Sequence, residues 1–122
     1  MTGELLEQYC DIVAEIQDIE EELRTEVTDT VQGSPEFPYS VHAISITGIS
    51  EAGRKRRKLE KLREQKREIE SFVSNTPHSR QRRILTLRII KGYTWKVVAA
   101  KMGHRYSEES VRKIYQRIIE KI

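Results

Sequence analysis

Hydrophobic residues in the first quarter of the chain recur at spacings that mostly alternate between four and three. These positions are Leu5, Tyr9, Ile12, Ile16, Ile19, Leu23 and Val27. Such spacing places the side chains on one stripe of a helix that packs lengthwise against another helix. The pattern therefore predicts a long first helix with an apolar seam.

A connector at about residues 32–49 interrupts this pattern. Gly33, Pro35 and Pro38 end the helical periodicity, because proline lacks a backbone donor and biases the preceding residue toward extended geometry. The next residues alternate between two sets, Val41, Ala43, Ser45 and Thr47 in one and His42, Ile44, Ile46 and Gly48 in the other. This alternation leaves open a short strand or β-ribbon around residues 40–47.

A second long helix is predicted from about Ser50 to about Val73. Ser50 or a neighbour can cap it, and Glu51 suits the dipole of its first turn. Its seam consists of Ala52, Leu59, Leu62, Ile69 and Val73, interrupted by Lys55 or Arg56 and by Lys66, whose aliphatic stems can lie along an apolar partner. Two such helices favour an antiparallel hairpin, although the same seam can instead drive assembly of a homo-oligomer.

Three shorter helices are predicted in residues 76–122. Asn75 or Thr76 can cap the first, with Pro77 in its first turn, and Gly92 suits its end. Its apolar face consists of Ile84, Leu85, Leu87, Ile89 and Ile90.

The remaining two helices have clear start and stop signals. Thr94 is expected to cap the fourth helix, which runs through Met102 and ends at Gly103, and Ser107 is expected to cap the fifth. Glu108 and Glu109 fall in the first turn of the fifth helix, and its inward stripe is Val111, Ile114, Ile118 and Ile122.

Together these elements predict an all-α protein. A long, coiled-coil-like antiparallel helical hairpin at residues 1–75 precedes a three-helix domain with a helix-turn-helix at residues 76–122. Composition agrees, because charged residues make up 34% of the 122 residues and hydrophobic residues only 37%, so apolar side chains must be gathered into stripes.

Charge is unevenly distributed along the chain. The net charge of +3 conceals a charge of about −9 in residues 1–31 and about +9 in residues 76–122. The acidic first helix can lie beside the basic second helix, which holds Arg54, Lys55, Arg56, Arg57, Lys58 and Lys61. The basic C-terminal third indicates an anionic partner, with a solvated surface as the alternative.

Several functional classes find no support in the sequence. No apolar run is long enough for a membrane span, and residues 1–10 lack a secretory signal, so we expect a cytoplasmic protein without a membrane partner. Cys10 is the only cysteine, and His42, His78 and His104 lie in separate segments without ligand spacing. The stretch from Gly48 to Gly53 is not a phosphate-binding loop. We therefore expect no enzyme activity, metal or cofactor.

The last two helices have the arrangement of a major-groove reader. A helix-turn-helix needs its second helix to hold an apolar stripe on the scaffold while the opposite face offers donors to bases and phosphates. On the fifth helix that face carries Ser110, Arg112, Lys113, Gln116 and Arg117. Arginine and lysine suit guanine edges or phosphates, and glutamine suits adenine.

Further candidate DNA contacts surround this face. They are Thr94, Lys96, Arg105, Arg82 and Arg83, with Arg80, Arg88 and Lys91 as additional cations that could clamp phosphates or merely be solvated. Trp95 is expected to pack against the third and fifth helices as a core anchor, rather than to stack on a base.

The residues from Ser79 to Ile122 resemble the region 4-like helix-turn-helix of sigma factors. More narrowly, they resemble the small phage and prophage late-transcription regulators of the RinA and ArpU type. The similarity lies in an arginine-rich helix at residues 82–88, in the pattern Gly92, Tyr93, Thr94, Trp95, Val98 and Ala99, and in the later run Ser110, Val111 and Arg112. The turn around His104 to Tyr106 is longer than is usual in region 4, so base-contact positions do not transfer directly.

The resemblance implies sequence-specific binding of double-stranded DNA in transcription regulation, with RNA polymerase as a candidate second partner. Two alternatives stay open. A DNA-packaging component similar to a small terminase subunit also joins a helix-turn-helix to a coiled coil, and an adaptor could bind RNA polymerase through the acidic first helix.

Overall fold

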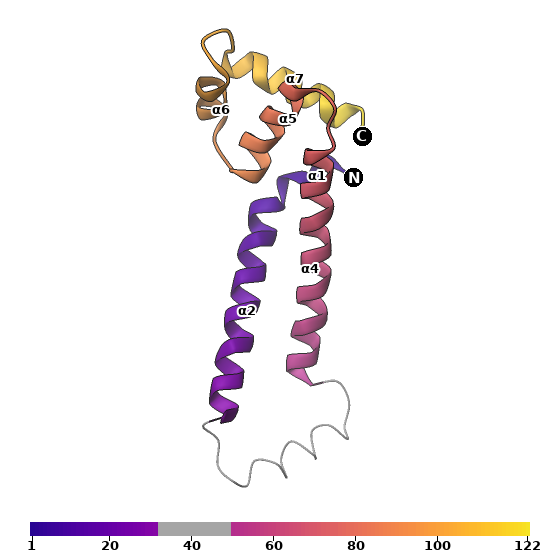
Figure 1. The fold of residues 1–122 in the computed structure, drawn as a ribbon, viewed down its shortest axis with the longest axis vertical. Coiled ribbons are helices and arrows are strands. Elements are labelled where there is room, and N and C mark those ends of the chain that lie inside the picture. Colours follow the sequence, from indigo (N-terminus) through magenta and orange to yellow (C-terminus); the bar gives the residue numbers. More distant parts are fainter. Residues whose placement is uncertain (32–49) are drawn as a thin grey trace. The chain divides into compact units, whose positions relative to one another are not determined.

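The computed structural model describes residues 1–31 and 50–122, with side chains described for residues 1–25 and 50–122. In chain order the elements are α1 (Gly3–Glu7), α2 (Tyr9–Val31), α4 (Glu51–Ser74), α5 (Ser79–Leu85), the π-helix η1 (Thr86–Ile90), α6 (Trp95–Met102) and α7 (Glu108–Glu120) (Figure 1). No strand occurs in these two ranges. The predicted all-α class is therefore confirmed, whereas the possible strand at residues 40–47 lies outside the described residues.

Contacts between residues divide the chain into two compact units. Unit 1 comprises Met1–Val13 and Gln65–Ile122, and unit 2 comprises Ala14–Glu64. The sequence predicted a domain boundary near residue 75, and these units divide the chain at other positions. That residues 1–75 and 76–122 are separate domains stays a prediction.

Unit 1 contains the best-buried side chains described. Leu6, Ile69, Ile84, Leu85, Val98 and Val111 are all fully buried. They come from α1, α4, α5, α6 and α7, so each of these helices contributes to the core. Full burial of one aliphatic side chain contributes about 1.5–3 kcal/mol to the stability of the fold. Packing in this cluster is therefore the main interaction that orients the short helices.

Unit 2 is a pair of helical segments, the later part of α2 and the earlier part of α4. Ile16 and Ile19 are buried on α2, and Leu59 and Leu62 on α4. Ion pairs join the segments, including Arg63 to Glu20 at 3.4 Å and Lys55 to Glu22 at 3.5 Å. The earlier residue of α2, Glu20, pairs with the later residue of α4, Arg63, and Glu22 pairs with the earlier Lys55. Within unit 2 the two segments therefore run antiparallel.

The N-terminal seam starts differently from the prediction. Leu6 is buried while Leu5 is only half-buried, because the helix is interrupted at Gln8, whose amide donates to the Leu5 carbonyl at 3.1 Å. A new helix begins at Tyr9, and the interruption shifts the apolar stripe by one position upstream of it. From Tyr9 to Ile19 the predicted seam positions are buried, and Val27 lies outside the described side chains.

The cap predicted for the third helix was wrong. α5 starts at Ser79, and its N-cap His78 makes no side-chain capping bond. Thr76 instead lies just after α4, and its hydroxyl donates to the carbonyl of Phe72, in the last turn of that helix, at 2.9 Å. Asn75 likewise donates its side-chain amide to the Ser71 hydroxyl at 3.1 Å. A threonine hydroxyl can bond a carbonyl one turn earlier, so the same residue types satisfy either helix end.

The other predicted caps, at Ser50, Thr94 and Ser107, match the predictions. The Thr94 hydroxyl accepts from the Val97 amide, the Ser107 hydroxyl accepts from the Ser110 amide, and the Ser50 hydroxyl accepts from the Gly53 amide. Gly92 has a φ of +70°, which L-residues with side chains rarely adopt. A side chain there would also meet the Cys10 sulfur, because an added Cβ would lie 2.9 Å from it.

Candidate nucleic-acid interface

The outer face of α7 is the centre of the candidate interface. Val111, Tyr115 and Ile118 are buried on its inner face, and α5 and α6 both pack against the helix. Arg112, Lys113, Gln116 and Arg117 are exposed on the opposite face. The amphipathic spacing therefore puts three cations and one amide on a surface that is held by a buried core.

Electrostatic contacts leave most of this face unoccupied. Lys113 pairs with Glu109 at 3.2 Å, one turn earlier on the same helix, and both side chains are highly exposed. An exposed pair of this kind contributes about 0.3–0.5 kcal/mol, so a phosphate can displace it at little cost. Within the described residues, Arg112 and Arg117 have no ion-pair partner.

Ser110 has a structural role that was not predicted. Its hydroxyl accepts from the Ser107 amide at 2.8 Å and donates to the Ser107 carbonyl at 2.9 Å, which completes a reciprocal capping box with Ser107. A hydroxyl has a single hydrogen to donate. In this conformation Ser110 fixes the start of α7 instead of offering that hydrogen to a ligand.

The predicted arginines before α6 also make internal contacts. Arg82 is half-buried and donates from Nη1 to the Thr76 carbonyl at 3.0 Å. Arg83 is exposed and donates from Nη2 to the Lys101 carbonyl at 3.2 Å, near the C-terminus of α6. These bonds satisfy carbonyls at two helix ends. Both cations thus stabilise the scaffold, and Arg83 still presents its charge to solvent.

The other predicted contacts lie near the two ends of α6. Thr94 caps its N-terminus, and Lys96 is exposed in its first turn. Arg105 is exposed in the turn between α6 and α7, which is closed by a hydrogen bond from the Tyr106 amide to the Gly103 carbonyl at 3.0 Å. A φ of +119° at Gly103 ends α6 and allows this turn.

An aromatic and ionic network connects four elements of unit 1 behind this face. The Arg88 guanidinium lies 4.6 Å from the centre of the Trp95 ring and donates to the Tyr93 carbonyl at 3.1 Å. The Trp95 ring meets the Tyr115 ring edge-on, at 5.0 Å between centres. The Tyr115 hydroxyl donates to the carboxylate of Glu7 on α1. Trp95 therefore contacts the third and fifth predicted helices, as expected, and a cation over its ring stabilises it further.

Glu7 is the member of this network that the sequence interpretation missed. Burial, together with the hydrogen bond to Glu7, raises the pKa of Tyr115 well above its ordinary value. Near Glu7 in the sequence, burial and a 2.6 Å hydrogen bond to Glu70 raise the pKa of Tyr9. No local pattern could have paired Glu7 with Tyr115, because 108 positions separate them.

Comparison with known protein families identifies the family of the chain. A protein-family model described as "Protein of unknown function (DUF722)" matches residues 2–122. The chain belongs to the DUF722 family. No curated protein and no solved structure matches the chain significantly.

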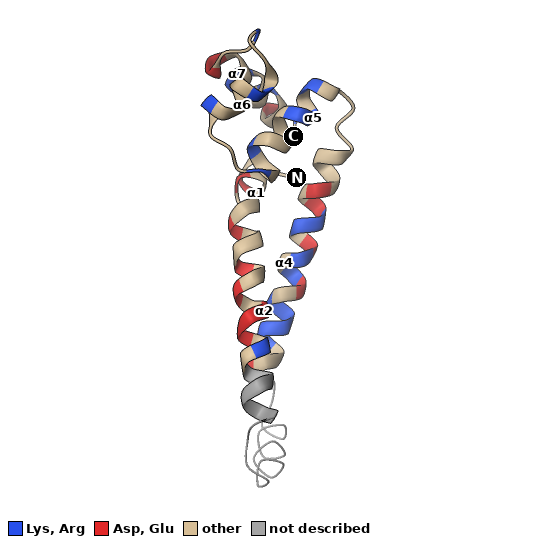
Figure 2. Cartoon of the chain, turned by 60° about the vertical axis from the view of Figure 1, so that its left-hand side comes forward, with Lys and Arg blue, Asp and Glu red and all other residues tan. Residues whose placement is uncertain are grey.

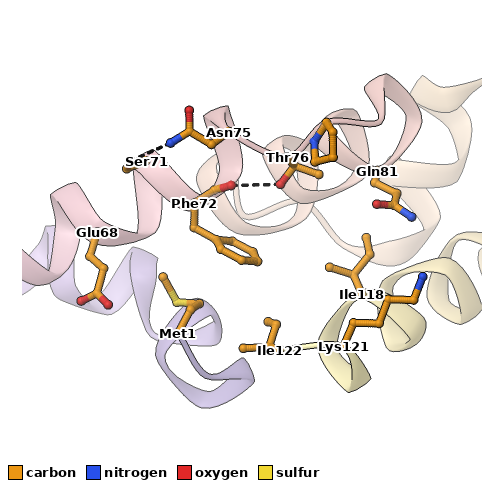
Figure 3. A pocket seen from close by; sticks show the side chains of 11 residues that line it. Met1, Glu68, Ser71, Phe72, Asn75, Thr76, Gln81, Ile118, Lys121 and Ile122 are labelled. Atoms are coloured by element: carbon orange, nitrogen blue, oxygen red, sulfur yellow. Dashed lines mark hydrogen bonds between the residues drawn. The ribbon is translucent and has the colours of Figure 1, made fainter.

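A separate apolar pocket in unit 1 of this DUF722 chain has a volume of about 580 Å³. Met1, Phe72, Ile118 and Ile122 line it, as Figure 3 shows, and the two hydrogen bonds of Ser71–Asn75 and Phe72–Thr76 lie on its upper side. Its charged lining residues are Glu68 and Lys121. The pocket is distinct from the cationic face, because its lining includes none of the exposed residues of that face, Arg112, Lys113, Gln116 and Arg117.

Residues 1–31 and 50–122 of this DUF722 chain lack two further kinds of feature. Within those ranges, no cluster of three or more histidine, cysteine, aspartate or glutamate side chains is arranged to hold a metal ion. No helix there has the length and apolar character needed to span a membrane.

Proposed function

We propose that this chain is a sequence-specific double-stranded DNA-binding protein of the cytoplasm, acting as a phage-type transcription regulator with a sigma region 4-like helix-turn-helix. The observation that carries the proposal is the outer face of α7, where Arg112, Gln116 and Arg117 are exposed while the inner face is buried. No enzymatic step is assigned to it.

The chemistry of this face suits a DNA groove. Arginine can pair with guanine through two hydrogen bonds, and glutamine can pair with adenine in the same way. Arg112 and Gln116 are one turn apart, so their side chains project from the same side of α7. The exposed cations Lys96, Arg83 and Arg105 are suited to phosphates, which position a protein without reading sequence.

Rigidity behind α7 supports the same function. The capping box of Ser107 and Ser110 fixes its start, and the network of Arg88, Trp95 and Tyr115 holds its inner face. Base reading depends on placing donors within hydrogen-bond distance, and a scaffold locked by packing does this better than a mobile loop.

The test is selection of bound sequences from a randomised duplex pool, followed by affinity measurements over a salt series. We expect a recurrent motif, tighter binding to it than to a scrambled duplex, and a steep loss of affinity with salt. Gln116→Ala should relax preference at one position of the motif. Arg67→Ala, which removes an exposed cation of α4, is the matched control and should leave the motif unchanged. Equal affinity for selected and scrambled duplexes would refute the proposal.

Two further measurements separate regulation from the other roles. A ring of many copies in solution would favour DNA packaging, whereas a monomer or dimer favours regulation. RNA polymerase is the proposed second partner, and co-purification with polymerase that depends on the acidic residues of α2 would support that contact.

A further inference from the structure

We infer that α4 carries a second surface for duplex DNA in unit 2: a cationic stripe formed by Arg54, Arg57, Lys58 and Lys61. The four residues are spaced i, i+3, i+4 and i+7, so they lie along one face of the helix. All four are exposed, whereas Leu59 and Leu62, on the neighbouring apolar seam of the same helix, are buried. Figure 2 shows this concentration of cations on α4.

The stripe is not neutralised by the acidic helix in the same unit. In the described part of the chain, Lys55 pairs with Glu22 of α2 and Arg63 pairs with Glu20 of α2. Those two cations flank the apolar seam, so they are the ones that α2 can reach. Among the described residues, none of the four stripe side chains has an ion-pair or hydrogen-bond partner.

Mutual repulsion makes the stripe unfavourable for the helix itself. The pairs 54 with 57, 54 with 58, 57 with 61 and 58 with 61 each place like charges three or four residues apart, which destabilises a helix. The neighbouring Glu60 and Glu64 lie toward one flank of the stripe and relieve this in part. A polyanion along the stripe would relieve it fully.

Duplex DNA fits this surface better than an acidic protein does. From Arg54 to Lys61 the helix rises about 10 Å, and about 10 Å of duplex axis carries about six phosphates on its two strands. Protein interfaces have centres enriched in aromatic residues and depleted in charge. The stripe has four cations and no exposed apolar side chain between them, because Leu59 is buried.

The choice of DNA as the ligand of the stripe rests on the proposed function. The stripe, however, lies in a different unit from α7 and makes a different kind of contact. The stripe offers charge without an amide or other group suited to a base edge, so it should bind phosphates regardless of sequence. It would add affinity and salt dependence, while α7 supplies discrimination.

The experiment measures binding of the full chain to a short scrambled duplex over a salt series. R57Q/K61Q removes two stripe cations, and R56Q/R67Q removes two exposed cations of the same helix that lie off the stripe. Loss of two phosphate contacts should lower the slope of log affinity against log salt by about 1.8 for R57Q/K61Q. R56Q/R67Q should retain the wild-type slope. An equal fall in both variants, or no fall in the first, would overturn the inference.

A second measurement uses the wild-type chain and so does not depend on the folding of a variant. Acetylation of Lys58 and Lys61, followed by mass spectrometry, should slow several-fold when scrambled duplex is added and should not slow with polyglutamate at equal charge. Unchanged rates with DNA, or equal protection by polyglutamate, would contradict a DNA surface. Both measurements use a scrambled duplex, so they do not depend on sequence discrimination. A failure to discriminate sequences would refute the proposed function, but it would leave the test of the stripe unaffected.

Discussion

Two helices of this protein present cations on an exposed face, but their surroundings differ. α7 is part of a core to which five helices contribute fully buried side chains, and its start is fixed by a reciprocal capping box. The α4 segment of unit 2 packs through a narrow seam that includes Leu59 and Leu62. The α7 face also includes the amide of Gln116, whereas the α4 stripe has cations alone. Charge suffices for attraction, while discrimination also needs donors held in place.

The largest expected difference lies in the cores. Ile84→Ala in unit 1 should lower the free energy of unfolding by about 4 kcal/mol, because Ile84 is fully buried and truncation leaves a cavity in the core. Leu62→Ala in unit 2 should cost about 2 kcal/mol, since Leu62 is 9% exposed beside solvent. Urea unfolding of both variants measures this. A larger loss for Leu62→Ala would reverse the comparison.

The functional difference should appear in sequence discrimination. Arg112→Ala should lose about 1–3 kcal/mol of preference for the selected motif over a scrambled duplex, because a paired base contact is removed. Arg57→Ala should weaken both duplexes alike and reduce the salt slope by about 0.9. Competition binding measures both. If Arg57→Ala changed the preference as much as Arg112→Ala, the division of roles between α7 and α4 would be wrong.

Helix caps give a smaller contrast. Ser107→Ala should cost about 1 kcal/mol of unfolding free energy, because it removes the bond from the Ser110 amide and breaks the capping box. Ser50→Ala removes a single bond from the Gly53 amide and should cost about 0.5 kcal/mol. Ser107→Asp keeps an acceptor and should restore most of the loss. Thermal unfolding of the three variants provides the measurement.

Alkaline pH should affect unit 1 through its tyrosines. The pKa of Tyr115 is raised above its ordinary value of 10.0 in the folded protein, mainly by burial and then by Glu7. Its stabilising contribution is therefore complete below pH 10 and is lost as the pH rises above 10, where the unfolded chain ionises first.

Tyr115→Phe should flatten this alkaline decline in the unfolding temperature. Tyr106→Phe is the matched control, because the Tyr106 hydroxyl has no carboxylate partner among the described residues. The same decline in Tyr115→Phe as in the wild type would show that the bond to Glu7 does not govern alkaline stability.

Local signals in the sequence predicted much of the framework. Thr94, Ser107 and Ser50 are capping residues as expected, and the glycine at position 92 has the positive φ that its place suggested. These features depend on residues within a few positions of one another, so their physics can be read directly from the sequence. The candidate DNA face followed in the same way, since helical spacing alone separates Val111 and Ile118 from Arg112 and Gln116.

Other residues could not be assigned because one residue type has two equivalent uses. Thr76 could cap the next helix or bond the end of α4, and the structure has the second arrangement. Ser110 could face a ligand or complete a capping box, and its hydroxyl is used in the box. The arginines at 82 and 83 bond carbonyls of residues 76 and 101. Such choices depend on which groups approach in space.

The sequence by itself determined the helical class, most seam positions, the caps of α4, α6 and α7 and the charge on each exposed face. These follow from periodicity and from interactions within one or two turns. Only the tertiary structure decided that Glu7 accepts from Tyr115, that Arg88 covers Trp95, and which cations of α4 find partners on α2. Those contacts join residues far apart in the chain, and they form only after burial of the apolar core has fixed the helices in place.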